Sequence, residues 1–365
     1  FMEEVPTTMV MQEREQPKPT FMLLRGVYNR PGEKVDPGIP LVLKGTNGSN
    51  LKTRLDLAKW LVNPENPLTA RVVINRYWQM YFGQGLVQTI EDFGSQGERP
   101  SHPRLLDWLA TEFVRNEWDI KAMQKIIVMS ATYRQSSRAT AKSLQEDPRN
   151  LLLARGPRVR LSAQAIRDQA LFVGGLLVEK LGGPSVKPYQ PEGLWEELAG
   201  DIPYNQSKGD DLYRRSLYTF WKRTIAPPSM LNFDAAQREM CTVRESRTNT
   251  PLQALNLMND VTFVESARGL AQRLLTNKKL ITPEDRLIYA FRIALARSPK
   301  ATERKILIDS LNVNLDFYQS NFQLAEKLVS VGDSLIPKGL DLKELAAYTT
   351  VASLVLNLDE TITKE

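Results

Sequence analysis

The sequence predicts a mainly α-helical protein: a compact multi-helix domain with an extended, β-like N-terminal arm and long ordered loops. Three observations lead to this prediction. Apolar residues recur at three- and four-residue spacings from Arg54 onward, which is typical of helices with a buried face. Residues 1–50 instead hold short apolar runs broken by proline and glycine. Between residues 182 and 213 the helical pattern stops while aromatic residues continue, which favours an ordered loop.

The composition is that of a globular protein with an ordinary core. Of the 365 residues, 42% are hydrophobic and 25% are charged. The net charge of +6 is spread along the chain without a Lys/Arg block, so we predict no nucleic-acid partner. No apolar run is long enough to span a bilayer, so no membrane span is predicted.

Cysteine and histidine are too scarce for several kinds of site. The single cysteine, Cys241, cannot form an internal disulfide, and the single histidine is His102. A c-type haem attachment motif needs two cysteines, and structural zinc sites take four Cys or His ligands. We therefore predict no cofactor and no metal in this chain.

Residues 1–50 are predicted to form an extended arm rather than a domain. Apolar runs at 9–11, 21–24 and 40–43 alternate with turn sequences at 25–26 and 29–32. Such an arm packs against later helices or forms the junction with a domain upstream. The chain starts Phe1-Met2 without a signal peptide, so it is expected to be a fragment or a processed piece. The predicted organisation is an arm at 1–50 and a helical domain at 51–365.

The helical part begins with a short helix that ends before Pro64. The next helix is expected to stop at Gly83, and the one after it to start with Ser101 as N-cap and Pro103 in its first turn. In chain order, the predicted helices cover residues 55–61, 72–81, 103–113, 118–129, 161–181, 249–275 in two parts, 282–296, 302–328 and 342–356.

Acidic residues and the imidazole gather in the loop after the second helix. Glu91, Asp92 and His102 could serve as general acids and bases, because neighbouring carboxylates can be held at different pKa values and an imidazole titrates near neutrality. Asp234 is a further acid/base candidate. The alternative is that these side chains cap helices and hold the loop by hydrogen bonds.

A basic and aromatic run follows the long irregular loop and is predicted to wall the main pocket with it. Arginine offers a planar fork to anions, and an aromatic face can stack on a sugar. The alternative is internal ion pairing with nearby acids, such as Asp210, Asp211 and Asp234, while the aromatic rings are buried. The candidate ligand-binding residues are Trp195, Arg214, Arg215, Trp221, Arg223, Arg244 and Arg247.

Several long motifs give the chain a family resemblance. The runs NPLTARVVINRYWQMYFGQGLVQTIEDFG, PSHPRLLDWLATEF, YRRSLYTFWKRT and TNTPLQALNLMND resemble the domain-of-unknown-function family 1553. This planctomycete-type domain ends large cytochrome-associated proteins. The resemblance covers roughly Leu51 to Glu365. It implies an extracytoplasmic, periplasmic or secreted location, and haem c in a missing N-terminal domain of the parent protein.

Two functions are carried forward. The first is a non-catalytic C-terminal interaction module of a secreted cytochrome-associated protein. Its partner would be the upstream companion domain or a cleaved N-terminal part, together with a polysaccharide or a redox protein. The second is an extracytoplasmic enzyme that acts on complex carbohydrate through Glu91, Asp92, His102 and Asp234. The enzyme requires at least two of these side chains to meet in one open cleft.

Overall fold

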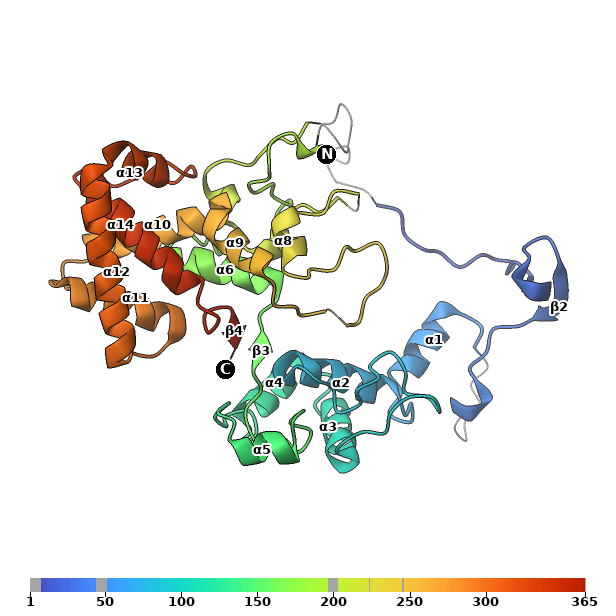
Figure 1. Cartoon of the computed structure of the whole chain (residues 1–365). Helices are drawn as coiled ribbons and strands as arrows, with labels where there is room; N and C mark the ends of the chain where they lie inside the picture. Colours follow the sequence, from blue (N-terminus) through green and yellow to red (C-terminus); the bar gives the residue numbers. More distant parts are fainter. Residues whose placement is uncertain (1–7, 44–50, 196–202, 223, 245, 365) are drawn as a thin grey trace. The chain divides into compact units, whose positions relative to one another are not determined.

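The computed structural model describes residues 8–43, 51–195, 203–222, 224–244 and 246–364 (Figure 1). The protein is mainly α-helical, as predicted, and the strands among the described residues are all short. The chain forms two compact units, Phe1–Arg134 and Gln135–Glu365. The division into an arm at 1–50 and a domain at 51–365 stays a prediction. Among the described residues, no helix is both long and apolar enough to cross a membrane.

The first unit begins with a small β-hairpin. Strand β1 (Thr20–Leu23) pairs antiparallel with β2 (Pro31–Val35), and Thr20 lies opposite Val35. Two 3-10 turns, Leu24–Gly26 and Leu41–Leu43, flank β2 in the chain. Every residue of β1 is exposed, so the hairpin has no core of its own.

Four helices follow in the first unit: α1 (Arg54–Leu61), α2 (Thr69–Phe82), α3 (Pro103–Arg115) and α4 (Ile120–Met129). Helix α2 stops at Gly83, as predicted, because Gly83 adopts a left-handed φ of 77°. Helices α2, α3 and α4 pack against one another. Their buried side chains include Ile74, Trp78, Phe82, Leu106, Leu109, Phe113, Met123 and Ile127.

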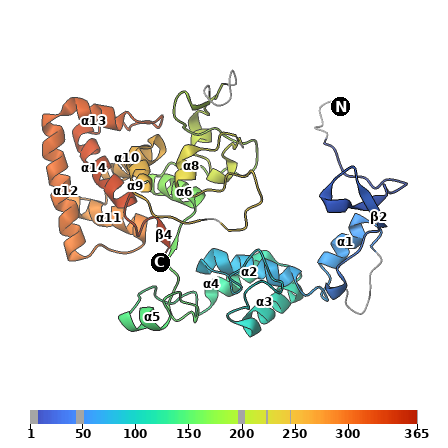
Figure 2. The ribbon, with the colours of Figure 1, turned by 45° about the vertical axis from the view of Figure 1, so that its right-hand side comes forward.

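The second unit is built in layers of helices. Helix α14 (Leu342–Leu356) lies between α12 (Ala301–Ser320) and α10 (Val261–Thr276), and α6 (Ala163–Gly174) packs on α10 (Figure 2). Helices α11 (Pro283–Leu295) and α13 (Phe322–Val329) complete this core. The remaining elements are α5 (Ala141–Glu146), α8 (Pro228–Asn232), α9 (Pro251–Asn259) and an antiparallel pair of β3 (Val159–Arg160) with β4 (Thr363–Lys364).

Three helix boundaries differ from the predictions. The helix predicted at 161–181 ends at Gly174, because Gly175 takes a left-handed φ of 75°. The helix predicted at 302–328 breaks at Asn321, which has non-helical backbone angles and separates α12 from α13. The N-cap of α3 is His102 rather than Ser101, whose hydroxyl donates to the Leu86 carbonyl instead. The two-part helix at 249–275 is confirmed as α9 and α10.

Helices α6 and α10 approach so closely that only glycine fits at their contact. A Cβ atom on Gly174 would lie 2.6 Å from the carbonyl oxygen of Ser266. A Cβ atom on Gly269 would lie 2.5 Å from the carbonyl oxygen of Gly174. Both neighbours are backbone atoms, which cannot swing aside. The two glycines therefore fix the distance between α6 and α10.

We predict that Gly269→Ala destabilises the protein by about 1–3 kcal/mol, because the added methyl group overpacks this contact. Helix propensity alone predicts the opposite sign, a gain of roughly 0.5–1 kcal/mol. Urea unfolding measures the difference. The control is Gly38→Ala, since a Cβ atom at Gly38 meets nothing within 4 Å. A stabilised Gly269→Ala variant would contradict the proposed close contact.

Candidate functional site

The acidic loop of the first unit is anchored by a buried amide on α2. The Nδ2 of Asn75 donates to the Val87 carbonyl at 2.9 Å, and its Oδ1 accepts the Val87 N–H at 2.8 Å. A Cβ atom on Gly85 would lie 2.6 Å from Asn75 Nδ2, so glycine is needed there. Sequence reasoning missed Asn75. The available signal was an amide inside the apolar face of a predicted helix.

Asp92 and His102 hold local bonds within this loop. The Asp92 carboxylate accepts the Gly94 N–H at 2.7 Å, and the Asp92 carbonyl accepts the Thr89 hydroxyl at 2.8 Å. The Nδ1 of His102 lies 3.1 Å from Ser101 Oγ. Glu91 is exposed on the same loop. The described contacts of Asp92 and His102 fit the alternative in which these residues hold the loop.

Asp234 belongs to the second unit and ties down a different loop. Its carboxylate accepts the Thr248 N–H at 2.6 Å and the Thr248 hydroxyl at 2.8 Å. Gln253 Nε2 lies 3.5 Å from the same carboxylate. Asp234 has a left-handed φ of 62°, which aspartate tolerates better than most residues. These bonds close the chain between residues 234 and 248.

Arg214 is buried and holds the start of the long loop. Its guanidinium donates to the carbonyls of Lys180 and Pro184, each at 3.0 Å, and to the Gly182 carbonyl. The guanidinium also lies 3.9 Å from the ring centre of Tyr218. Both terminal nitrogens are thus used by the protein backbone. This geometry argues against the expectation that Arg214 presents donors to an anionic ligand, and also against its pairing with an acid.

Helix α6 supplies the matching support for the basic and aromatic run. Buried Arg167 donates to the carbonyls of Arg214 at 2.9 Å and Leu212 at 2.8 Å. Burial lowers the pKa of Arg167, while the neighbouring carboxylates, Asp168 first, oppose that shift. Asp168 accepts the Ser216 N–H at 2.7 Å. Sequence reasoning missed both residues, because their partners lie more than forty positions along the chain.

Arg215 is the exposed neighbour of Arg214. Its Nε lies 3.5 Å from the Asp168 carboxylate, and half of its side chain, 50%, is exposed. Trp221 donates from Nε1 to the Gln237 carbonyl at 3.2 Å, and Arg238 lies over its ring at 4.4 Å.

The other basic candidates are spread along the chain. Arg247 donates to the Arg160 carbonyl at 2.8 Å, and Arg244 is exposed. Arg223 lies outside the described residues. Of the candidates that the structure describes, Arg215 is exposed and in contact with an acid.

Aromatic residues of the long loop and of the run that follows it surround Lys187. The Nζ of Lys187 lies 5.8 Å from the ring centre of Trp195, 5.7 Å from Tyr204 and 5.3 Å from Phe220. Lys222 Nζ approaches the Trp195 ring at 5.0 Å. Trp195 is only 3% exposed, so its ring faces the chain's own lysines and offers no open stacking surface. Burial also raises the pKa of Tyr204.

We predict a sharp difference between two adjacent arginines. Arg214→Met should lower the free energy of unfolding by about 2–5 kcal/mol, because the buried guanidinium loses its charged hydrogen bonds to three loop carbonyls. Arg215→Met should cost about 0–1 kcal/mol, since Arg215 is half exposed and its Nε lies 3.5 Å from the Asp168 carboxylate. Urea unfolding of the two variants provides the comparison. Equal, small losses would show that Arg214 does not hold the loop.

We predict that Lys187→Met destabilises the protein by about 1–2 kcal/mol through loss of the cation–π contacts. Lys187→Arg should keep most of the stability, because a guanidinium also binds aromatic faces. Thermal unfolding followed by circular dichroism measures both, with Lys208→Met at an exposed position as control. The assignment fails if Lys187→Met is as stable as the control.

Comparison with known proteins adds one finding to this geometry. The family model described as PSD1, protein of unknown function (DUF1553), matches residues 53–311. No curated protein and no solved structure matches the chain.

Proposed function

We propose that this chain, which belongs to the PSD1 family of proteins of unknown function (DUF1553), is a non-catalytic interaction module. Its N-terminal arm docks a companion domain. In this proposal the module ends a secreted, cytochrome-associated multidomain protein. The companion is the upstream domain of the same protein or its cleaved N-terminal part. The observation that carries the proposal is the uncovered apolar surface of the arm.

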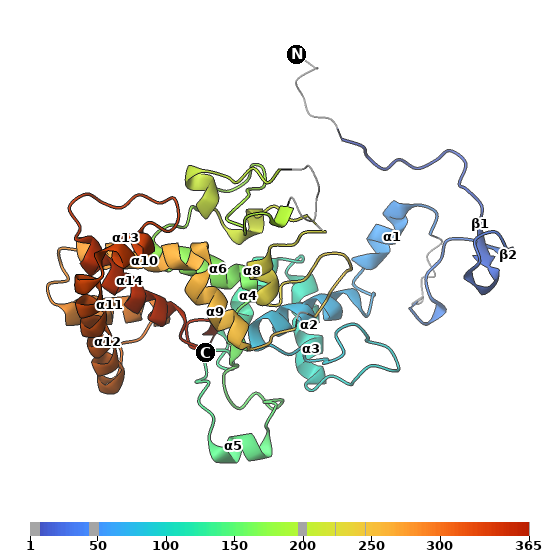
Figure 3. The same ribbon diagram turned by 45° about the horizontal axis from the view of Figure 1, so that its top comes forward.

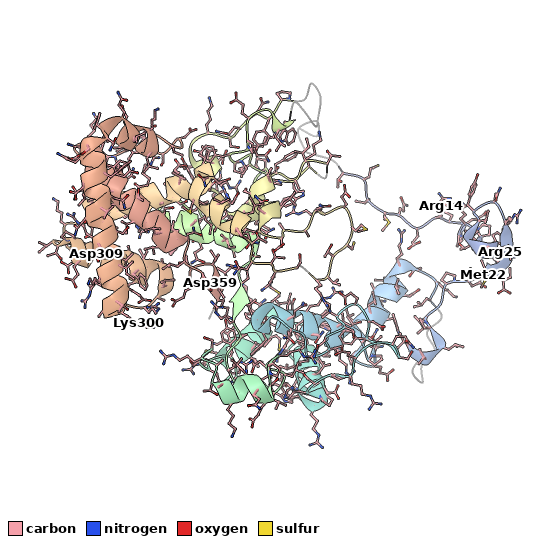
Figure 4. All side chains as sticks on the ribbon, viewed as in Figure 1. Arg14, Met22, Arg25, Lys300, Asp309 and Asp359 are labelled. Carbon is pink, nitrogen blue, oxygen red and sulfur yellow. The ribbon has the colours of Figure 1, made fainter. Side chains whose placement is uncertain are left out.

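The arm exposes more apolar side chains than a hairpin in water can support. Met22 is 54% exposed, Leu24 57% and Val42 89% (Met22 is labelled in Figure 4). An isolated two-stranded hairpin is marginally stable at best, and needs further strands or a helix to cover it. Contiguous exposed apolar surface marks sites of protein interaction. A companion domain that covers β1 and the Leu41–Leu43 turn would meet this need.

The acid/base candidates give less support to the enzyme. Glu91, Asp92 and His102 belong to the first unit, whereas Asp234 belongs to the second. The carboxylates of Asp92 and Asp234 each accept hydrogen bonds from nearby residues. A general base needs a lone pair within reach of a substrate proton. The local bonding of these carboxylates therefore favours the module over an enzyme acting on complex carbohydrate.

Further partners of the module are a polysaccharide or a redox protein. Any haem c would be held by the companion domain, because covalent attachment uses two cysteines and this chain has only Cys241. The module would contribute binding and orientation to such an assembly.

We predict that the arm is covered in the native protein. Hydrogen exchange of the amides in β1 and β2 should be slower by about tenfold or more in protein isolated from its natural source than in the separate chain, because docking suppresses local opening. Amides of α14, whose side chains are largely buried, should be protected in both samples and serve as the reference. Equal exchange of the hairpin in the two samples would overturn the proposal.

A variant of the arm distinguishes docking from general stickiness. The triple change Phe21→Ser, Met22→Ser and Leu24→Ser should release the companion domain while leaving the melting temperature of the chain unchanged. Leu335→Ser changes a side chain that is 90% exposed in the second unit, and it should retain the companion.

A further inference from the structure

Helix α12 carries an apolar stripe on its outer face. Ile306 is 66% exposed, Val313 68% and Phe317 46%. Their spacings of seven and four residues place them along one side of the helix. In Figure 1, Figure 2 and Figure 3, α12 lies at the rim of the helices that surround α14. Isolated exposed apolar residues need no explanation, but an aligned set of three does.

The stripe is not needed for packing within the chain. The inner side of α12 buries Leu307, Leu311 and Tyr318 against the core, and Tyr318 Oη lies 3.2 Å from Thr350 Oγ1 on α14. The buried and the exposed apolar residues lie on different faces of α12. The stripe is therefore not part of the face that packs against the core.

The charges beside the stripe are arranged by sign along the helix. Lys305 stands near its N-terminal end, and Asp309 and Asp316 stand further along; all three are exposed. Their neighbours are already paired, Glu303 with Arg297 at 2.8 Å and Arg304 with Glu284 at 2.7 Å. By contrast, no described residue forms an ion pair with Lys305, Asp309 or Asp316. Asp309 is labelled on α12 in Figure 4.

We propose that a second copy of this chain packs on the stripe, with the two α12 helices antiparallel. A two-fold axis level with Leu311 and Asn312 sets Ile306 of one copy opposite Phe317 of the other. The same symmetry brings Lys305 of each copy to Asp316 of the other, because residues on one flank of an antiparallel pair face the same flank of the second helix. In a parallel two-fold pair, opposite flanks of the two helices meet instead, so Lys305 does not reach Asp316 of the other copy. The charge order thus favours an antiparallel second copy.

The size of the stripe sets the strength of the contact. From Ile306 to Phe317 the helix rises about 17 Å, at ~1.5 Å per residue. A contact of this length falls at the small end of specific interfaces. The dimer is therefore weak, with a dissociation constant on the order of micromolar. This surface is separate from the arm and goes beyond the proposed docking of a companion domain.

Sedimentation velocity of the full chain tests the proposal between about 1 and about 100 µM, the range that brackets a micromolar dissociation constant. We use the chain with the three arm serines as well, so that association through the arm is removed. The sedimentation coefficient should rise with concentration from monomer to dimer in both. Val313→Glu should raise the dissociation constant about tenfold or more. Leu335→Glu, at an exposed apolar residue off α12, should leave it unchanged. A chain that stays monomeric, or a dimer that tolerates Val313→Glu, overturns the proposal.

A charge exchange tests the orientation. Lys305→Asp and Asp316→Lys should each weaken the dimer severalfold, while the double variant restores it, because the opposite charges still meet. In a Cys241→Ser background, Lys305→Cys chains mixed with Asp316→Cys chains should cross-link to each other on mild oxidation. Absence of a cross-link between the two variants would overturn the antiparallel assignment.

Discussion

The close approach of α6 and α10 at Gly174 and Gly269 is the contact on which the second unit depends. With a backbone carbonyl 2.5 Å from where a Cβ would stand, the helices can have only this separation. Arg273 on α10 reinforces it, since its Nη1 donates to the Val173 carbonyl at 2.6 Å at the C-terminal end of α6. The fixed α6 then presents Arg167 to the chain at 212–216, and Arg214 in turn holds the chain at 180–184. The contact between α6 and α10 therefore orders both of these loop segments, through Arg167 and Arg214.

A buried carboxylate links the same loop to α10. Glu265, with no exposed surface, accepts the Tyr213 hydroxyl at 2.9 Å and the Ser334 N–H at 2.6 Å, and pairs with Arg268 at 3.2 Å. A Cβ on Gly332 would lie 2.2 Å from the Glu265 carboxyl carbon. The chain can therefore pass this close to the carboxylate only because residue 332 has no side chain. Replacing a buried ion pair by apolar residues is often neutral for stability, whereas its hydrogen bonds favour one arrangement of the chain. We infer that this cluster determines where the loop attaches to α10, more than it determines the free energy of unfolding.

The features that the sequence predicted are those with local causes. Gly83 ends α2 and Pro103 lies in the first turn of α3 because backbone freedom and capping act within a few residues. The Ser101 hydroxyl could have capped α3, but it donates to the Leu86 carbonyl, fifteen residues earlier in the chain. Arg214 looked like an anion ligand because nothing near it in sequence revealed three carbonyl partners at 180–184. The aromatic contacts of Lys187 were not predicted, because the rings around it come from three separate segments of the sequence.

Polar groups and apolar groups are used differently in this protein, and the difference bears on function. Catalysis requires polar side chains whose capacity is left for a substrate. Here Asp92, Asp234 and Arg214, which chemistry marks as candidates, use their charged groups on the protein's own backbone. The apolar side chains show the reverse, since Leu24 on the arm and Val313 on α12 extend into water. The free energy still available is that of covering apolar surface, at roughly 25 cal/mol for each Å² buried. The uncovered apolar surface of the arm and of α12 is therefore the common basis of the two contacts with another polypeptide that we propose.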